Sequence, residues 1–505
     1  MDPDPPSDAQ GFAKVGDVLL ARGETERAIA SYHQALALNP QLFETHLSLA
    51  AAQARQGKLA EATVSCRNAI ALHPNHSGAH HELGCLLERQ GKLDEASTSF
   101  QRAIALDPNH VDSHNNLATL LGRQGRLDEA CASLQKVLAL DPNHCDAHCN
   151  LGNVLLHQGK LDDAFNSYQK VLTLNPNHIY AHNNLGALLE RQGRLDEALA
   201  SLQKALALNP NHSSAYNNLG RVLQKQGRLE DAIASCRRAL AIRPDDVKAH
   251  ETLGSAFHSK GELAEAAGHY KRAIELGTRN PTIHHALAAL KGEDAGPIPA
   301  QVVRDCFDDY ASRFDTHLVG ALGYSAPKLM REAVARLTSN NRRFQHALDL
   351  GCGTGLVGEH FRDIVTEIDG VDLSPKMLEQ ARRKQIYGRL DREEIVTWLE
   401  RAVAEALSFD IVFSADVFIY VGNLEPAFKA VRAVLANDGL FVFSVEHLAQ
   451  GSFELLPTLR YAHSVSYLRQ LASRHRFTVE LCEQVNLRRD RGATIAGTIL
   501  VLRGH

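Results

Sequence analysis

Hydrophobic positions in the first part of the chain recur at helical spacing on paired segments, and each pair fills about 34 residues. In one such unit, residues 179–210, two helical segments lie on either side of Gly193, and Pro210 follows the second. Glycine suits the C-terminal end of a helix, whereas proline stops one. The pattern therefore predicts a helix–turn–helix unit.

The unit repeats along the chain with a constant period. Prolines stand 34 residues apart at Pro40, Pro74, Pro108, Pro142, Pro176, Pro210 and Pro244. We set unit starts at residues 9, 43, 77, 111, 145, 179, 213 and 247, and expect a capping helix at 282–290. The eighth position of every unit is Gly or Ala, which lets paired helices approach closely. Because no unit buries its apolar face alone, the units should stack into a superhelix with a concave surface.

Two rows of polar residues are predicted to point away from the partner helix, at the sixth and thirteenth positions of the units. An asparagine amide both donates and accepts, so an asparagine row could clamp an extended peptide backbone, and a basic row would favour acidic segments. The alternative is that asparagine only keeps this surface soluble. The candidate peptide-binding residues are Asn116, Asn150, Asn184, Asn218, Arg89, Arg123, Arg191 and Lys225.

Histidines gather in the turns between units, mostly after Pro-Asn, and their period explains them as turn residues rather than catalytic ones. One spot is denser and holds His144, Cys145, His148 and Cys149. The paired CxxC spacing of zinc sites is missing there, so these residues are interpreted as ordinary substitutions within one repeat. No metal site is expected.

The pattern changes after residue 291 to short apolar runs that alternate with helical segments. We expect a disordered N-terminus at 1–8, the repeat array at 9–291, a linker at 292–300 and a second domain at 301–505. Such alternation favours a parallel sheet covered on both faces. Strands are expected at 346–352, 368–373, 390–396, 409–416 and 439–446, helices at 357–365, 375–386, 397–407 and 423–436, and a closing pair of strands at 479–489 and 493–503 around a tight turn at 490–492.

Candidate chemistry lies in the glycine-rich loop Asp349-Leu-Gly351-Cys-Gly353-Thr-Gly355, which follows a strand and opens a helix. Glycines let a ligand approach the backbone. Asp372 ends the next strand, where a carboxylate can accept both hydroxyls of a ribose. Leu356 stands where the dinucleotide fingerprint has its last glycine, so that fingerprint is excluded. A purely structural glycine turn in another doubly wound fold is the alternative.

Composition narrows the class of protein. The formal charge of −5, from 54 basic and 59 acidic residues, argues against binding to nucleic acid by bulk attraction to phosphate. No apolar run approaches the roughly 18 residues of a membrane-spanning helix, and the acidic, proline-rich start is unlike a signal peptide. Nine cysteines show no disulfide framework. We therefore expect a cytoplasmic protein that uses neither nucleic acid nor membrane as a partner.

These features resemble known families. The period of 34 with its small residues resembles the tetratricopeptide repeat family, and the asparagine row resembles the ladder of protein O-GlcNAc transferases. The loop with Asp349, the terminal Asp372 and the closing hairpin resemble class I S-adenosylmethionine-dependent methyltransferases. Segments 303–329, 414–424, 440–446, 460–464 and 487–497 are similar to bacterial methyltransferases that carry such repeats. The fold implied is an all-α superhelix followed by an α/β Rossmann-like domain.

The resemblance implies S-adenosyl-L-methionine as cofactor. The loop glycines would cradle its methionine end, Asp349 would hold the amino group, Asp372 the ribose, and Leu373 and Glu394 the adenine. A lead-in helix with Tyr310, Phe314, Asp315 and His317 would cover the cofactor, the alternative for its aromatic residues being core packing. The cofactor-binding candidates are Tyr310, Phe314, Asp349, Gly351, Cys352, Gly353, Gly355, Asp372, Leu373, Glu394 and Asp416.

The implied reaction is in-line attack on a sulfonium methyl group, which depends on alignment and exclusion of water more than on a strong base. If a base is needed, family position points to Asp416, His447, Tyr461 and His463, although His463 is equally well explained as a structural residue. We expect an active methyltransferase whose repeats recruit a protein partner or substrate. The alternative is a repeat scaffold whose second domain binds the cofactor without turnover. A third alternative, a glycosyltransferase, would have only the repeat array in common with this chain, and the motifs of the second domain argue against it.

Overall fold

The computed structural model describes residues 8–293, 296, 298–311, 314–338, 342–490 and 493–505. Contacts divide the chain into two compact units, Met1–Ile242 and Arg243–His505. The segment expected to be a disordered N-terminus lies outside the described residues except for Asp8, whose side chain accepts the N–H of Gly11 at 2.7 Å and so caps the first helix.

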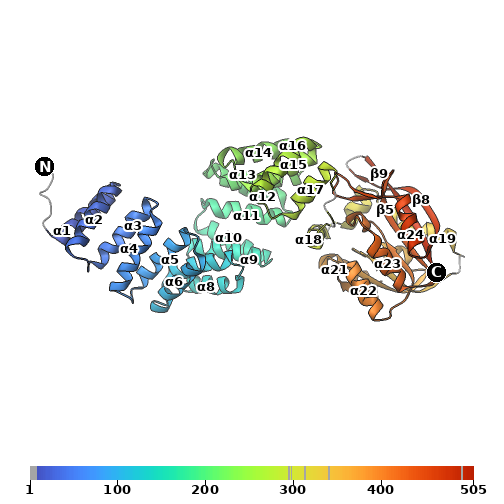
Figure 1. Ribbon diagram of the computed structural model, residues 1–505, viewed down its shortest axis with the longest axis horizontal. Helices are drawn as coiled ribbons and strands as arrows, with labels where there is room; N and C mark the ends of the chain where they lie inside the picture. The colour runs from blue at the N-terminus through green and yellow to red at the C-terminus, as the bar shows by residue number, and fades with distance from the viewer. Residues whose placement is uncertain (1–7, 294–295, 297, 312–313, 339–341, 491–492) are drawn as a thin grey trace. The chain divides into compact units, whose positions relative to one another are not determined.

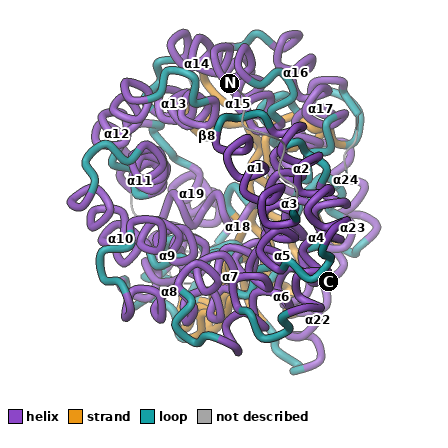
Figure 2. The backbone as a smooth tube through the Cα atoms, turned by 90° about the vertical axis from the view of Figure 1, so that its left-hand side faces the viewer, coloured by secondary structure: helices purple, strands orange, loops and turns teal. Residues whose placement is uncertain are grey.

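The first unit consists of consecutive helix pairs (Figure 1), and its helices follow a curved course when seen from the side (Figure 2). The first helix of each pair begins at the predicted unit start, from residue 9 onward, so the predicted repeat architecture is confirmed. A glycine with positive φ, such as Gly193 at 75°, lies in the turn within each pair. The helices are α1 (Ala9–Ala21), α2 (Thr25–Leu38), α3 (Phe43–Arg55), α4 (Leu59–Leu72), α5 (Ser77–Arg89), α6 (Leu93–Leu106), α7 (Val111–Arg123), α8 (Leu127–Leu140), α9 (Cys145–His157), α10 (Leu161–Leu174), α11 (Ile179–Arg191), α12 (Leu195–Leu208), α13 (Ser213–Lys225) and α14 (Leu229–Ile242).

The small eighth position of each unit makes room for a bulky side chain of the second helix. A Cβ atom at Gly152 would lie 2.5 Å from the ring of Tyr168, and one at Gly186 would lie 2.6 Å from Leu202 Cγ. Both large side chains are fully buried. Close packing of the two helices therefore depends on the missing side chain.

The turn histidines cap helices. The Nδ1 atom of His144 accepts the backbone N–H of Ala147 at 3.1 Å, and His178 and His212 repeat this contact in the following units. His148 Nε2 lies 3.0 Å from the carbonyl oxygen of Pro142. The dense spot around Cys145 thus consists of ordinary repeat positions.

The second unit begins with one more pair, α15 (Val247–Lys260) and α16 (Leu263–Glu275), and the helix α17 (Pro281–Lys291) near the expected capping position. An α/β domain follows. Its elements are α18 (Ala300–Tyr310), η2 (Thr316–Ala321), α19 (Ala326–Leu337), β1 (Phe344–Leu350), α20 (Leu356–Phe361), β2 (Val365–Asp372), α21 (Pro375–Arg383), β3 (Arg389–Arg392), α22 (Ile395–Ala404), β4 (Phe409–Ser414), η3 (Phe418–Tyr420), α23 (Glu425–Val434), β5 (Leu435–Leu448), β6 (Phe453–Leu455), β7 (Tyr461–Ser464), α24 (Val465–Arg474), β8 (Phe477–Asp490) and β9 (Ala493–Gly504).

The sheet runs in the order β3-β2-β1-β4-β5-β7-β6, with parallel pairs from β3 to β5. β9 joins β5 antiparallel, and β8 pairs with β9. Along β1, Leu348 and Leu350 belong to one apolar core and Ala347 to another, so both faces are covered. This confirms the predicted Rossmann-like sheet. The residues of the expected turn, 491–492, lie outside the described part of the chain.

The capping helix α17 packs against the sheet domain within the second unit. Ala289 forms an apolar cluster with Leu455 and Tyr461, and His258 Nε2 lies 2.6 Å from the carbonyl oxygen of Pro457. The helices of the last repeat therefore contact the loop region around β6 and β7.

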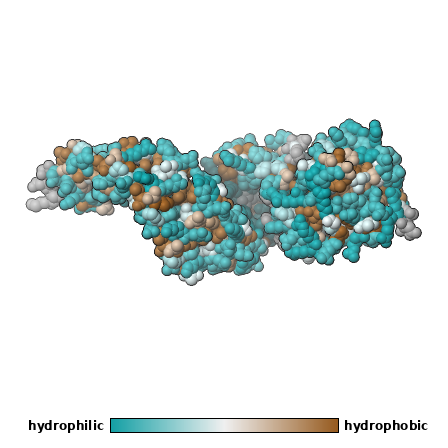
Figure 3. Space-filling model, turned by 90° about the horizontal axis from the view of Figure 1, so that it is seen from below, coloured by the Kyte–Doolittle hydropathy of each residue, from teal (hydrophilic) through white to brown (hydrophobic). Residues whose placement is uncertain are grey.

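Within the described residues, no helix is both long enough and apolar enough to cross a membrane. The face drawn in Figure 3 is mostly hydrophilic, with hydrophobic residues scattered over it.

We expect Gly152→Ala to destabilise the repeats by about 1–3 kcal/mol, because the buried Tyr168 ring must move. Gly268→Ala is the matched control, since a Cβ there meets nothing within 4 Å and alanine favours a helix by about 1 kcal/mol. Urea unfolding followed by circular dichroism should separate the two variants. Equal destabilisation by both would contradict the packing argument.

Candidate functional site

The glycine-rich loop connects β1 to α20 and combines two kinds of glycine. Gly351, Gly353 and Gly355 all have positive φ, at 70°, 54° and 88°. A Cβ atom at Gly351 would collide with Val417, whereas one at Gly353 would meet nothing within 4 Å. Gly351 therefore permits packing, and Gly353 leaves open space beside the backbone that a ligand can approach.

Asp349 lies fully buried just before this loop. Its Oδ2 atom accepts the hydroxyl of Tyr387 at 2.6 Å, whereas its Oδ1 atom has no partner among the described residues. Burial raises the pKa of this carboxyl to about 7. A buried, unpartnered carboxylate oxygen fits a cationic group such as the amino group of S-adenosylmethionine.

Asp372 ends β2 directly beside the loop. Its Oδ2 atom accepts the N–H of Gly353 at 2.9 Å, and its Oδ1 atom accepts the N–H of Ser374 at 2.8 Å. Desolvation raises its pKa to about 6, and the charge of Asp308 acts in the same direction. These backbone contacts hold the carboxylate at the carboxyl edge of the sheet, where parallel α/β folds bind ligands.

Two cavities open at this edge and share Tyr420 as a wall residue. The first, about 320 Å³, is bordered by the glycine loop and by Tyr310, Phe314 and Asp416. The second, about 650 Å³, is bordered by Leu373 and Glu394. The cofactor-binding candidates are thus brought together around one edge, with the predicted adenine residues on the far side of Tyr420. Glu394 also caps α22, where it accepts the N–H of Val396 and of Thr397.

The lead-in segment is tied to the loop by polar contacts. Asp308 on α18 accepts the hydroxyl of Ser374 at 2.5 Å. Asp315 accepts the hydroxyl of Thr354 and pairs with Lys384 Nζ at 2.9 Å. Tyr310 and Phe314 pack edge to face with ring centroids 5.2 Å apart. The segment therefore covers the loop. The side chain of His317 lies outside the described residues.

A buried charged group forms the floor of the first cavity. Arg488, only 2% exposed, bonds to both Asp416 and Glu446. Arg460 lies 3.7 Å from the Glu446 carboxylate and also borders the cavity. Asp416 has a positive φ of 56°. Its Oδ1 atom accepts a hydrogen bond from the hydroxyl of Ser444 at 3.2 Å. Sequence reasoning found Asp416 but not its partners. These lie in the segments 440–446 and 487–497 that carry the family resemblance, but nothing in the sequence showed that the strands β5 and β8 bring them together.

The other residues considered as bases lie elsewhere. His463 is fully buried, its Nε2 atom is 2.9 Å from the carbonyl of Gly422, and burial lowers its pKa to about 4. Tyr461 donates to the carbonyl of Gly296 at 2.6 Å and borders the second cavity. His447 contacts Thr498 at 3.2 Å. Among the described residues that border the first cavity there is no histidine.

The asparagine row links neighbouring repeats. Its amide groups donate to residues of the preceding unit, as in Asn150 to Asn115 at 3.0 Å and Asn184 to Asn153 at 2.8 Å. Asn218 donates to Asn183 at 3.0 Å and Asn116 contacts Cys85 Sγ at 3.6 Å. Asn150 and Asn184 also border a hollow of about 270 Å³ beside Tyr180, which is 63% exposed.

The basic row is largely paired. Arg89 donates to the carbonyl of Ala54 at 2.9 Å, Arg123 pairs with Glu88 at 2.9 Å, and Lys225 pairs with Glu190 at 2.5 Å. Arg191 is exposed. The positive charge available to a partner is therefore smaller than the sequence suggests.

Comparison with known proteins covers both parts of the chain. Residues 348–441 match a methyltransferase domain model. Tetratricopeptide repeat models match residues 16–57, 65–96, 81–144, 143–211, 183–247 and 217–281.

Similar proteins include the malonyl-[acyl-carrier protein] O-methyltransferases of Enterobacter lignolyticus, 32% identical over 33% of this chain and 60% of the relative, and of Salmonella typhimurium, 29% identical over 35% and 66%. The chain thus spans less than two thirds of these relatives. A tetratricopeptide repeat protein from Parabacteroides merdae is 21% identical over 49% of this chain and 98% of that one, with a TM-score of 0.43. This chain thus carries tetratricopeptide repeats followed by a region that matches a methyltransferase domain.

Proposed function

We propose that the chain transfers the methyl group of S-adenosylmethionine to a carboxylate, and that the repeats recruit the protein bearing this acceptor. The part of this proposal that concerns the methyl donor rests on one observation. The Oδ1 atom of Asp349 has no partner among the described residues and lies beside an open glycine loop. When bound, the cofactor supplies a methyl group activated by a positively charged sulfur. Asp349 would hold its amino group and Asp372 its ribose, with Leu373 and Glu394 at the adenine.

The proposal that the methyl acceptor is a carboxylate is supported by the side chains that border the first cavity. Tyr420 has its pKa raised to about 12 by burial, and burial raises the pKa of Cys352 well above its ordinary value. Asp416 is bonded to Arg488. A nucleophile that is already ionised at neutral pH suits such a cavity, because no described neighbour is placed to remove its proton.

Arg460 favours a carboxylate among ionised nucleophiles, since a guanidinium matches its planar geometry. The similar proteins named above act on malonyl-[acyl-carrier protein] as O-methyltransferases, which agrees with this acceptor class. In this proposal Arg488 holds Asp416 in place, Arg460 orients the acceptor, and the aromatic wall excludes water.

The concave row of asparagines is proposed to recruit the partner, with the array taken to end at residue 291. None of the nine cysteines forms a disulfide, which supports a reducing, cytoplasmic compartment. The second candidate is a scaffold that binds the cofactor without turnover. The basic row is largely paired with acceptors of the preceding repeats, and this pairing favours neither candidate.

Asp349→Asn should weaken binding of S-adenosylmethionine at pH 8 by about 10–100-fold, because a charge-assisted hydrogen bond is lost. In the parent, affinity should rise as pH rises through about 7, where Asp349 ionises. Tyr387→Phe is the control, since it removes the hydroxyl that stabilises the ionised form and should shift this midpoint upward. Calorimetry over pH 6–8.5 measures both. Unchanged affinity in Asp349→Asn would refute the donor site.

Arg460→Gln should raise the KM for a malonyl thioester of acyl carrier protein by about 10–100-fold and leave cofactor affinity unchanged. Arg469→Gln, at an exposed position outside both cavities, is the matched control. Transfer of a radiolabelled methyl group to a base-labile ester is the readout. Equal transfer to an acetyl thioester, which has no free carboxylate, would contradict the acceptor class, and cofactor binding without any transfer would favour the scaffold.

Replacing Asn116, Asn150, Asn184 and Asn218 by Ala in the full chain should abolish capture of its partner. Each change also removes a contact between repeats, at a cost of about 1 kcal/mol. Tyr168→Phe controls for this loss, because it removes the 2.7 Å hydrogen bond to Asn153 without altering the row. The recruitment proposal fails if the fourfold variant captures the same proteins as Tyr168→Phe.

A further inference from the structure

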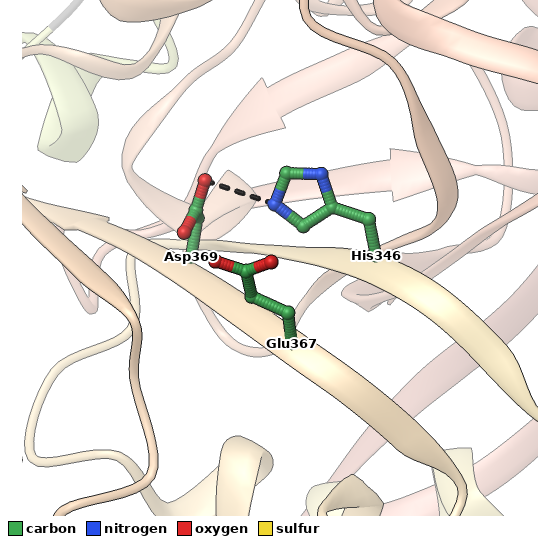
Figure 4. Close-up of side chains that lie close together, drawn as sticks. All are labelled: His346, Glu367 and Asp369. Carbon is green, nitrogen blue, oxygen red and sulfur yellow. Dashed lines mark hydrogen bonds and ion pairs between the residues drawn. The ribbon is translucent and has the colours of Figure 1, made fainter.

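Three potential metal ligands lie together on the two strands that carry the candidate site, but toward the other end of the strands. His346 is on β1, and Glu367 and Asp369 are on β2. The register pairs His346 with Glu367 and Leu348 with Asp369, so the three side chains share one face of the sheet. Figure 4 shows them turned toward one another.

The spacing of the three side chains fits a small divalent ion. One ligand atom from each residue lies within 4.8 Å of the other two. His346 Nε2 and Asp369 Oδ2 are 3.1 Å apart. Ligands bound to zinc at about 2.0–2.2 Å in a tetrahedron are about 3.3–3.5 Å apart. The imidazole and the Asp369 carboxylate, at 3.1 Å, would have to move apart slightly to reach that separation, and the carboxylate of the exposed Glu367 would have to move closer.

The charge at this position is unbalanced. Asp369 is 4% exposed and lies beside a second carboxylate, with one imidazole facing both. Arg389 pairs with Asp369 in the register of β2 and β3, but its side chain forms ion pairs with Asp391 at 2.7 Å and Glu405 at 3.1 Å. A buried carboxylate with excess negative charge around it is stabilised by a cation.

Neighbouring groups hold the ligands in place. The His346 ring packs on Phe409 with centroids 4.4 Å apart, and its backbone N–H donates to Asp410 at 3.1 Å. A Cβ atom at Gly388 would lie 3.0 Å from Glu367 Oε1, so this glycine leaves the room that the carboxylate uses. Ligands on rigid strands lose little freedom when they bind an ion.

We propose that His346, Glu367 and Asp369 bind one divalent transition-metal ion of the zinc type, with water completing the coordination on the exposed side. A histidine and two carboxylates are a donor set that zinc accepts, with a fourth position left open. His346 lies three residues before Asp349, about 10 Å along the strand. The ion therefore fastens β1 to β2 and takes no part in methyl transfer, so this inference is independent of the proposed function.

Cobalt(II) tests the site in the full-length chain, because its visible absorption reports coordination without any activity assay. The parent should bind one more equivalent of cobalt(II) than His346→Ala or Glu367→Gln does, and added zinc should displace this cobalt ion. Because Glu367 is exposed, the Glu367→Gln variant should keep its fold. Its affinity for cobalt(II) should fall at least tenfold.

His475→Ala is the matched control, because His475 also bonds a carboxylate, Glu425, at 2.7 Å, but Arg474 rather than a second acid completes that group. It should bind as many equivalents as the parent. Zinc should raise the thermal midpoint of the parent and of His475→Ala, but not that of Glu367→Gln. Equal numbers of equivalents in the parent, His346→Ala and Glu367→Gln would overturn the proposal and leave an ion pair between His346 and Asp369.

Discussion

Parallel pairing of β1 with β2 is the constraint on which the candidate site depends. It brings the ends of two strands to one edge, so that Asp349 and Asp372 lie beside the same glycine loop. In the described part of the chain, no cationic side chain bonds to either carboxylate, and their charges are stabilised by a tyrosine hydroxyl and by backbone N–H groups. The fold thus holds two buried acids side by side, and burial raises the pKa of both carboxyl groups.

The repeats rely on a different constraint, which is local. Each unit requires one small residue opposite one bulky residue, as with Gly152 and Tyr168, and the asparagine row then ties each unit to the one before it. Contacts of this kind join residues that are close in sequence or one repeat apart. The array is therefore built by repetition, whereas the sheet domain needs contacts between distant segments, such as Arg488 with Asp416, which are 72 residues apart.

This difference explains how much the sequence could predict. Repeat starts such as 145 and 179 match helix starts because the signal lies within each unit, and β1, β2, β4 and β5 were found because buried strands form apolar runs. The strands β6 and β7 and the helix α24 were not predicted, since strands of three or four residues are defined by pairing rather than by pattern. In the site, the motif located Asp349 and Asp372. It could not locate Arg488, which lies 72 residues from Asp416.

The buried charges beside the glycine loop and at the floor of the first cavity are stabilised in different ways. Next to the loop, but outside the residues that border the cavity, Asp349 keeps one oxygen without a partner among the described residues. At the floor, Arg488 satisfies both Asp416 and Glu446, and Arg460 adds a second guanidinium at a looser 3.7 Å. The described charged residues that border the cavity itself are Asp416, Arg460 and Arg488. Together with Glu446 they form a group of two guanidinium ions and two carboxylates, whose formal charges cancel. In the proposed function, the cationic cofactor would bind beside the loop and the acceptor beside Arg460, so the methyl group would pass between these two positions.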